Sequence, residues 1–351
     1  MRRTGRCGVV EVRVHGVADI GALEGPWRDL EQRSACSFFQ SWTWVGCLAA
    51  ERFPTPVLVE ATDSGRTVAL GLFNLVGQRL FLGESGSAEL DSPYVEQNGI
   101  LTEAGREEEL TELCLRGLIR SRHVVLSGVG ESVVHAVRRA GGLTVVRRSQ
   151  SSPYVDLAAI RDSGGDYLAG RSANTRQQVR RSNRLYAPVV LERAATVDAA
   201  HAMLDEMAAL HQAAWRGRGK PGSFADPFFG RFHHTLINRG FRFDQIVLNK
   251  LSSSGTTVGI LYNFVWRDQV LAYQSGFAFR PGDSHAKPGL TCHHAAIQDA
   301  LGQGLDRYDF LAGEDRYKQS LADRSHRQFW VEAGPIWSCR LLIRRFLRRV
   351  G

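Results

Sequence analysis

The chain has 351 residues, of which 43% are hydrophobic and 23% charged, a balance that excludes a disordered chain, a fibre and a coiled coil. Its length is too great for one ordinary hydrophobic core and predicts two domains of similar size. The formal net charge is +8 and comes mostly from arginine. Because the guanidinium group suits phosphate and carboxylate, this charge predicts an anionic partner: a nucleotide cofactor, a tRNA or an anionic surface. GC-rich coding produces the same arginine bias without any partner.

In the first half, alternating apolar residues predict strands and apolar residues at helical spacing predict helices. The strands are expected at residues 9–14, 57–60, 67–76, 80–82, 124–126 and 143–146. The helices are expected at residues 41–53, 107–120 and 131–140.

The second half repeats this mixture, so the predicted fold class is α/β (α+β). Its strands are expected at residues 189–192, 243–251, 256–266, 269–277, 308–311 and 329–332. Its helices are expected at residues 174–185, 197–215, 226–239 and 288–302.

A polar, turn-prone stretch at residues 147–152 predicts the boundary between the halves. We therefore expect domains at residues 1–150 and 151–335, followed by a basic amphipathic helix at 336–351. Docking of Trp337, Leu341 and Phe346 on the domain is the favoured role of that helix, and weak contact with an anionic membrane is the alternative.

An internal similarity indicates that one fold is used twice. Residues 72–76 (LFNLV) align without a gap with residues 261–265 (LYNFV). Two hairpins look alike by chance, but these two occupy the same point in similar orders of elements.

No apolar run is long enough to cross a bilayer, and no signal-peptide pattern follows the first methionine. The six cysteines have no short metal-binding spacing, so we expect free thiols in a cytoplasmic protein. Two His pairs, at residues 233–234 and 293–294, have no acidic or cysteine ligands to complete a set, so no metal site is expected.

A series of segments occurs in the order of a known family. The segments are NTRQQVRRSNRL at 174–185, LHQAAWRGRGKPGSF at 210–224, YQSGF at 273–277, PGL at 288–290 and YDFLAGEDRYK at 308–318, with FQSWTW at 39–44 and DSPY at 91–94. Together they resemble the BioF/CelD-type acetyltransferase-like proteins, which are similar to FemAB-type aminoacyltransferases and belong to the GNAT superfamily. The resemblance covers most of the chain.

This resemblance implies two tandem GNAT-like domains, each a mixed and mainly antiparallel sheet flanked by helices. It implies an N-acyltransferase that moves an acyl group from a thioester, acyl-CoA or an acyl carrier, to an amine on a small molecule, peptide or glycan precursor. Acyl-CoA would be a co-substrate, with no tightly bound cofactor. The chain lacks the Arg/Gln-x-x-Gly-x-Gly/Ala loop that holds the CoA pyrophosphate and has FRPGDSHAKPGL at 279–290 in its place.

Two alternatives remain open at this point. The first is a Fem-like enzyme that uses aminoacyl-tRNA as its donor and forms a peptide bond. The second is a non-catalytic GNAT-fold partner in polysaccharide or envelope assembly.

The cofactor-binding residues are expected where a helix begins. Lys287, Pro288, Gly289 and Leu290 lie between a predicted strand pair and a predicted helix. The first amides of a helix lack internal partners and attract anions, and glycine lets a ligand approach the backbone. An ordinary helix start is the structural alternative.

The catalytic residues are expected just past a strand end, where open sheets usually build their sites. Asp309 or Glu314 would take the proton of the amine, Tyr317 would protonate the leaving group and Lys318 would hold an anion. Asp309 anchoring the local structure is the alternative for that residue.

Substrate-binding residues are expected on two helices and a strand. Arg176 and Arg180 share one stripe of a helix, where like charges repel unless an anion relieves them. A solvated basic face and an ordinary loop are the structural alternatives. The remaining candidates lie near the basic loop at 216–224 or on the adjacent strand: His211, Trp215, Arg216, Arg218 and Tyr273.

Overall fold

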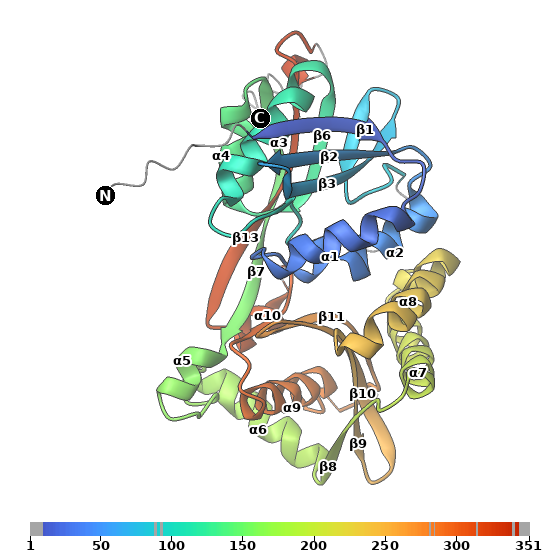
Figure 1. Cartoon of the computed structure of the whole chain (residues 1–351). Helices are drawn as coiled ribbons and strands as arrows, with labels where there is room; N and C mark the ends of the chain where they lie inside the picture. The colour runs from blue at the N-terminus through green and yellow to red at the C-terminus, as the bar shows by residue number, and fades with distance from the viewer. Residues whose placement is uncertain are drawn as a thin grey trace. The chain divides into compact units, whose positions relative to one another are not determined.

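The computed structural model describes residues 10–87, 90–91, 94–280, 282–283, 285–313, 315–338 and 341–343. The chain divides into two compact units (Figure 1). Unit 1 contains residues 1–149 and 327–351, and unit 2 contains residues 150–326.

Unit 1 is built on a mixed sheet with the strand order β1-β2-β3-β4-β6-β13. Neighbouring strands are antiparallel except β4 and β6, which are parallel, and the short strand β5 pairs with β3. The strands are β1 (Glu11–Gly16), β2 (Pro56–Asp63), β3 (Arg66–Val76), β4 (Arg79–Leu82), β5 (Leu101–Thr102), β6 (His123–Val129) and β13 (Arg324–Gly334).

The core of unit 1 lies between this sheet and two helices, α3 (Glu107–Ser121) and α4 (Glu131–Ala140). The predicted apolar face of α3 is confirmed, because Leu110, Cys114 and Leu118 are all buried there. Two further helices, α1 (Glu24–Gln32) and α2 (Trp42–Arg52), pack against each other.

Unit 2 repeats the strand pattern of unit 1, with the order β8-β9-β10-β11-β12-β7. Again one neighbouring pair, β11 and β12, is parallel, and the others are antiparallel. The strands are β7 (Leu143–Asp156), β8 (Val189–Arg193), β9 (Ile246–Ser253), β10 (Thr256–Trp266), β11 (Gln269–Phe277) and β12 (Arg307–Asp309). The similar segments at 72–76 and 261–265 lie in the matching strands β3 and β10, and each contributes a buried asparagine.

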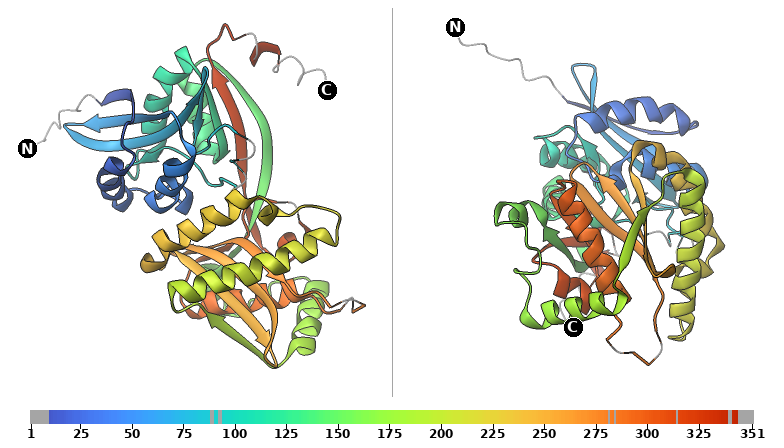
Figure 2. Two further views of the ribbon diagram at one scale, coloured as in Figure 1. Left: turned by 90° about the vertical axis from the view of Figure 1, so that its right-hand side faces the viewer. Right: turned by 90° about the horizontal axis from the view of Figure 1, so that it is seen from below.

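Helices cover both faces of the sheet in unit 2 (Figures 1 and 2). One face carries α6 (Ala173–Tyr186) and α9 (Pro288–Gly302), and the other carries α7 (Val197–Arg216) and α8 (Pro227–Gly240). The short helices α5 (Leu157–Asp162) and α10 (Arg316–Leu321) flank β12 in the sequence. Helix α7 approaches β11 so closely that a Cβ at Gly276 would lie 2.3 Å from the carbonyl oxygen of Met207, so only glycine fits.

The predicted fold class is confirmed, since both units are mixed and mainly antiparallel sheets with helices around them. The division between the units falls between residues 149 and 150, within the stretch at 147–152, but that stretch is not a turn and continues the long strand β7. Residues 327–335, assigned above to the second domain, lie in unit 1 because β13 pairs with β6. Helices α1, α5 and α10 had no prediction; α5 and α10 are each only six residues long.

The C-terminal segment docks through one of its three predicted apolar residues. Leu341 is fully buried against Leu143 and Val145, whereas Trp337 is 69% exposed, so its predicted docking is wrong. Phe346 lies outside the described residues.

Four of the six cysteines, Cys36, Cys47, Cys114 and Cys292, are buried free thiols, and Cys7 and Cys339 lie outside the described residues. In the part of the chain that the structure describes, no helix is long and apolar enough to cross a membrane. The same described part contains no group of three or more metal-ligand side chains.

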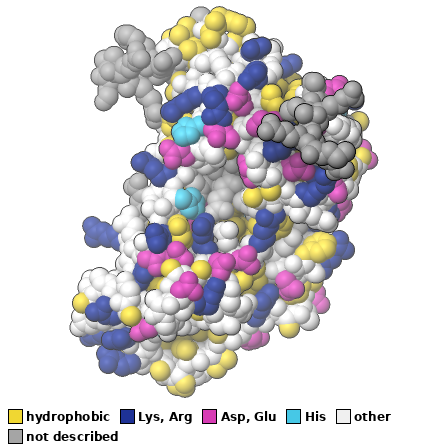
Figure 3. All heavy atoms as spheres, turned by 60° about the vertical axis from the view of Figure 1, so that its left-hand side comes forward, with side chains coloured by type: hydrophobic (Ala, Val, Ile, Leu, Met, Phe, Trp, Pro, Cys, Tyr) yellow, Lys and Arg dark blue, Asp and Glu magenta, His cyan; other side chains and the backbone are white. Residues whose placement is uncertain are grey.

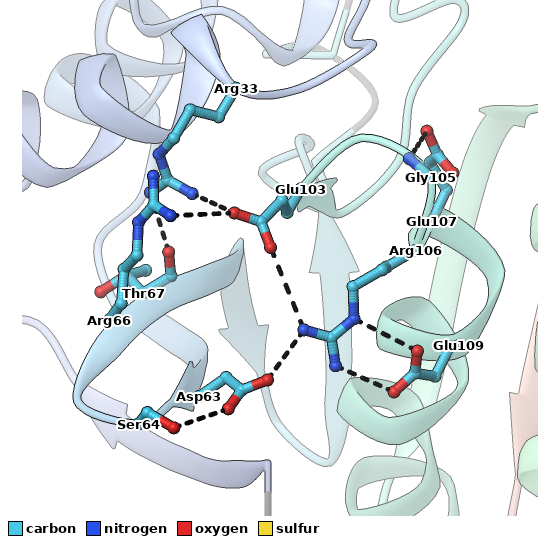
Figure 4. Close-up of polar contacts among 10 residues, drawn as sticks. All are labelled: Arg33, Asp63, Ser64, Arg66, Thr67, Glu103, Gly105, Arg106, Glu107 and Glu109. Atoms are coloured by element: carbon cyan, nitrogen blue, oxygen red, sulfur yellow. Dashed lines mark hydrogen bonds and ion pairs between the residues drawn. The ribbon is translucent and has the colours of Figure 1, made fainter. Parts of the chain in front are cut away.

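A network of ion pairs holds the β2–β3 hairpin of unit 1 to its surroundings (Figure 4). Glu103 accepts from Arg33 at 2.7 Å and lies 3.6 Å from Arg66. Arg106 contacts Asp63 at 2.9 Å and Glu109 at 3.0 Å. Arg33 is only 18% exposed and Glu103 24%, so water screens this pair less than a surface pair.

We expect Glu103→Ala to lower the free energy of unfolding by about 1–2 kcal/mol, because it removes the less exposed of the two carboxylates that pair with half-buried Arg33 and leaves only Asp29. Chemical denaturation measures this loss. The control is Glu11→Ala, whose pair with Arg13 is about two-thirds exposed, and it should cost less than about 0.5 kcal/mol. Equal losses from the two variants would contradict a structural role for the network.

Candidate active site

The parallel strands β11 and β12 separate after three residue pairs. Gln269–Leu271 pairs with Arg307–Asp309, and there the pairing ends. Beyond it, β11 stays on β10 as far as Phe277. The chain after β12 follows β7 instead, where the amides of Phe310 and Gly313 donate to the carbonyls of Pro153 and Ser151. The facing edges of β11 and of residues 310–313 are therefore no longer paired with each other.

In unit 1 the corresponding place between β4 and β6 is filled by the chain itself. The side-chain amide of Asn98 donates to the carbonyls of Leu82 in β4 and Ser127 in β6, at 3.0 and 3.2 Å. The backbone amide of Asn98 donates to Gly128. A Cβ at Gly128 would lie 2.4 Å from the carbonyl oxygen of Val95, so the filling segment is in close contact with β6. A ligand would have to displace this segment to lie there.

On the α9 face of unit 2, His293 is the centre of an aromatic group beside the separating strands. Its Nδ1 forms a 2.9 Å hydrogen bond with the hydroxyl of Tyr308. Its ring stacks on Tyr317, with ring centroids 5.6 Å apart, and also contacts Phe310 and Phe277. The group joins α9, α10 and the ends of both strands.

Burial, together with the charge of nearby Lys318, lowers the pKa of His293 to about 3, so the imidazole is neutral at physiological pH. Its Nε2 is buried and has no hydrogen-bond partner among the described residues. Burial also raises the pKa of Tyr317, so its hydroxyl keeps its proton.

Asp309 faces the other side of the sheet, because it follows Tyr308 in a strand. It is fully buried, and its carboxylate accepts from Ser152 at 3.1 Å and from the amide of Leu311 at 2.8 Å. His326 Nδ1 lies 3.7 Å from its other oxygen.

Burial raises the pKa of Asp309 to about 6. The hydrogen bond from the Leu311 amide, the charge of Arg307, the Ser152 hydroxyl and the charge of Lys318 all oppose this rise. The carboxyl group therefore changes charge close to physiological pH, which suits a general base. Burial and Arg307 lower the pKa of neighbouring His326 to about 4, so this imidazole is neutral there.

Lys318 lies close enough to both groups for its charge to lower the pKa of His293 and of Asp309. Its ammonium group donates to the carbonyl of Ala312 at 3.0 Å. Gly313 has a φ of +149°, a backbone conformation that residues with a Cβ rarely adopt, so glycine is favoured at this position beside the Lys318 nitrogen. Glu314 lies outside the described residues.

The start of α9 is tied to α6. The Lys287 ammonium donates to Gln178 at 2.7 Å, and the Ser182 hydroxyl both accepts from the Lys287 amide and donates to its carbonyl. Leu290 donates its amide to the Lys287 carbonyl and Pro288 has no amide proton. Gly289 retains the one first-turn amide without a hydrogen bond among the described residues, and its Cα faces the ring of Phe277.

Of the two arginines on α6 that were predicted to bind substrate, only Arg180 is exposed to solvent. Arg176 is half-buried and donates to the carbonyl of Arg171, so it caps a neighbouring turn. Arg180 is exposed, on the side of α6 away from its buried residues Val179 and Ser182.

The basic loop after α7 folds back on its own helix. His211 is hydrogen-bonded through Nδ1 to the Ser275 carbonyl of β11, at 3.1 Å, and through Nε2 to the Ser223 amide. Arg218 lies over the rings of Trp215 and Phe279, at 5.6 and 5.8 Å. Burial lowers the pKa of His211, so both contacts are those of a neutral ring that ties the loop to the strand.

Arg216 is exposed, and its Nε donates to the Gln212 carbonyl. Tyr273 lies on the α8 face of β11, where its ring contacts Phe264 and His233 at 4.6 and 5.2 Å.

The structure brings His293, five residues after Pro288 in α9, together with Tyr308, Phe310 and Tyr317. The helix start itself contacts α6 and Phe277. The structure does not group all predicted residues: Tyr317 lies on the α9 face and Asp309 on the opposite one. Sequence reasoning considered His293 only as a metal ligand and missed both Ser152 and His326. No sequence spacing could have identified His326, because it is 17 positions from Asp309 and the fold of the sheet brings the two side chains together.

A small cavity in unit 2 has a mixed polar and apolar lining that includes Asn249, Asn263, Asp299 and Tyr308. Its volume is about 20 Å³, which is enough for about one water molecule and too small for an acyl donor. The Oδ1 of Asn263 is buried without a partner among the described residues, which such a water would satisfy.

Residues 171–319 match the family model described as an acetyltransferase (GNAT) domain. No curated protein sequence matches the chain.

Among solved structures, FemX is 8% identical with a TM-score of 0.61, covering 94% of this chain and 99% of FemX. The C-terminal domain of a putative lysylphosphatidylglycerol synthetase from Agrobacterium fabrum is 11% identical with a TM-score of 0.58, covering 93% and 95%. L-PGS from Bacillus licheniformis is 11% identical with a TM-score of 0.57, covering 93% and 96%. At these identities the likeness is one of fold.

We expect Tyr308→Phe to lower the free energy of unfolding by about 1–3 kcal/mol, because it removes the hydrogen bond of a fully buried histidine. Denaturant unfolding at pH 7 tests this. Tyr317→Phe keeps the stacked ring and should cost clearly less. If Tyr308→Phe were as stable as the natural protein, the His293–Tyr308 hydrogen bond would contribute nothing to the free energy of unfolding.

Proposed function

We propose that unit 2, where residues 171–319 match the acetyltransferase (GNAT) domain model, transfers an acyl group from a thioester to an amine by direct attack. The observation that carries this proposal is the separation of β11 from β12 beside His293, Tyr317 and Lys318. Unpaired strand edges hydrogen-bond to amide-containing ligands, and a thioester donor with a pantetheine-like arm is such a ligand.

Unit 2, rather than unit 1, is proposed to hold the donor. In unit 1 the same place is filled by Asn98 and its neighbours, which satisfy the backbone groups of β4 and β6. The Gly289 amide at the start of α9 would supply a donor for an anionic group, with Lys287 beside it. Pro288 sets the helix direction and Leu290 anchors the first turn in the core.

The amine nitrogen would attack the thioester carbonyl, and the C–S bond would break as the new C–N bond forms. Asp309, ionised above pH 6, would take the proton released by the amine, directly or through one water. Tyr317, which keeps its proton, would donate it to the departing thiolate. Lys318 would favour the ionised form of Asp309, and positioning would supply most of the rate.

The acceptor is proposed to approach from the α7 side, past Tyr273 and the loop held by His211 and Trp215. Exposed Arg216 and Arg218 would bind a carboxylate or phosphate of the acceptor. An amine on a small molecule, a peptide or a glycan precursor would fit this description.

A second candidate is an aminoacyl-tRNA donor, which the exposed Arg180 on α6 and the missing pyrophosphate loop favour. On the face drawn in Figure 3, however, basic side chains are mixed with acidic ones and form no continuous basic field. The charge of +8 thus gives the tRNA donor less support than a concentrated patch would.

Native mass spectrometry of freshly purified protein tests the donor, since it would detect retained CoA, carrier or RNA. Thermal shift with CoA at 100 times its dissociation constant should show stabilisation of about 2.7 kcal/mol. Failure of CoA to stabilise the protein, together with tRNA binding that weakens steeply with salt, would favour the second candidate.

We expect Asp309→Asn to lower kcat about 10²–10⁴-fold and to remove the fall in rate below pH 6, because the base is lost. Acyl transfer measured from pH 5 to 8 tests this. The control is Asp306→Asn, which alters an exposed partner of Arg161 and should keep both rate and pH profile. An unchanged rate in Asp309→Asn would contradict its role as the base and would favour the alternative that the chain is a non-catalytic GNAT-fold partner.

The same substitution should not weaken the fold. A raised carboxyl pKa means that the folded state binds the proton more tightly than the unfolded state, so the natural protein loses stability as pH rises from about 4 to 6. The amide of the variant cannot ionise, so we expect Asp309→Asn to be more stable by up to about 3 kcal/mol at pH 8 and equal near pH 4. Denaturant unfolding at both pH values measures this, and the opposite order would contradict the raised pKa.

A further inference from the structure

The carboxyl group of Asp309 is enclosed by the protein. Its side chain is 0% exposed, so an amine in solution does not touch it. Its Oδ1 accepts from the Ser152 hydroxyl at 3.1 Å and from the Leu311 amide at 2.8 Å. A general base must lie within hydrogen-bond reach of the proton it removes, directly or through one intervening group. A second group is therefore needed to bring the proton of a substrate amine to Asp309.

His326 lies between the other carboxylate oxygen and solvent. Its Nδ1 is 3.7 Å from Oδ2 of Asp309 and is buried, with no hydrogen-bond partner among the described residues. Its side chain is 32% exposed, so the ring reaches solvent as well as the buried carboxylate. The 3.7 Å distance is longer than a hydrogen bond, but catalytic hydrogen bonds are often this long until a substrate binds and tightens them.

This pair lies on the face of the sheet from which the acceptor is proposed to approach. Asp309 is opposite Leu271 in β11 and Tyr154 in β7, and directly paired residues place their side chains on one face. Side chains alternate along a strand, so Tyr273 lies on the same face as Leu271. The His326 ring contacts Tyr154, with ring centroids 6.0 Å apart. An amine that passes Tyr273 is therefore on the His326 side of the sheet.

The charges around the pair suit a neutral imidazole beside a carboxylate. Burial and the charge of Arg307 lower the pKa of His326 to about 4. The charges of Arg307 and Lys318 also favour the ionised form of Asp309. A neutral imidazole has one N–H donor and one acceptor nitrogen, so it can accept a proton on one nitrogen while it gives up the proton of the other.

We infer that His326 is the catalytic residue that removes the proton from the substrate amine, and that Asp309 receives a proton from His326. The amine nitrogen forms the C–N bond as the C–S bond breaks. The amine proton moves to Nε2 of His326, and the proton on Nδ1 moves to Oδ2 of Asp309. The thiolate takes its proton from Tyr317. Asp309 afterwards returns its proton to solvent through His326. This inference rests on the proposed acyl transfer.

The position of the proton on His326 tests the pair without turnover. The carboxylate of Asp309 faces Nδ1, so we expect the neutral ring to carry its proton there at pH 8. Nitrogen NMR of the full chain with ¹⁵N-labelled histidine measures this, and the signal is assigned by its loss in His326→Gln. A ring with its proton on Nε2 would overturn the inference, because Nε2 could not then accept the proton of the amine.

Kinetics of two substitutions at the same position test the catalytic role. Acetyl-CoA is the donor, glycylglycine and glucosamine are the probe amines, and release of thiol is measured. We expect His326→Ala and His326→Gln each to lower kcat about 10²-fold or more. Added imidazole should restore the His326→Ala rate at least about tenfold, because it fills the space and supplies the missing base. It should not restore His326→Gln, whose side chain occupies that space.

The matched control is His135→Ala, which removes an exposed histidine of α4 in unit 1 and should keep the natural rate. Unfolding of each variant separates loss of catalysis from loss of fold, and a purely structural role of His326 predicts no rescue by imidazole. A natural rate in His326→Gln together with a slowed Asp309→Asn would overturn this inference and leave the proposed function standing. Absence of acyl transfer by the natural protein would overturn both.

Discussion

The central constraint in this protein is the short pairing of β11 with β12. A parallel pair that ends at Leu271 and Asp309 leaves two lengths of backbone that cannot satisfy each other. The chain resolves this partly by holding β11 to β10 and residues 310–313 to β7. The remaining edges meet the aromatic group around His293, so the place where backbone pairing fails is also where the titratable side chains converge.

The two units show what this constraint permits. Both have four antiparallel strands followed by one parallel step, yet unit 1 fills the place beside its parallel step with Asn98. An asparagine that bridges two carbonyls makes that place a stable part of the fold. The same architecture is therefore filled beside the parallel pair in unit 1, whereas in unit 2 the edges of β11 and of residues 310–313 are not paired with each other. Of these two places, we propose only the one in unit 2 as the place that holds a donor.

The electrostatics of unit 2 follow from burial on two faces of one strand. Tyr308 and Asp309 are neighbours, so one joins His293 on the α9 face and the other joins Ser152 on the opposite face. Burial holds His293 neutral and raises the pKa of Asp309, and Lys318 at the strand end acts on both. Asp309, whose pKa is about 6, and Tyr317, which keeps its proton, therefore lie on opposite faces of the sheet.

The sequence by itself determined the elements and their repetition. Period-two and period-3.6 patterns are local, so they predicted most strands, the face of α3 and the matching segments of β3 and β10. Tertiary structure alone decided that β7 runs through the expected turn, that β13 returns to unit 1 and that Asn98 fills one site. It also decided that His293 and His326 join Tyr308 and Asp309. These outcomes depend on the free energy of contacts between residues far apart in the chain, and a local sequence pattern gives no information about such contacts.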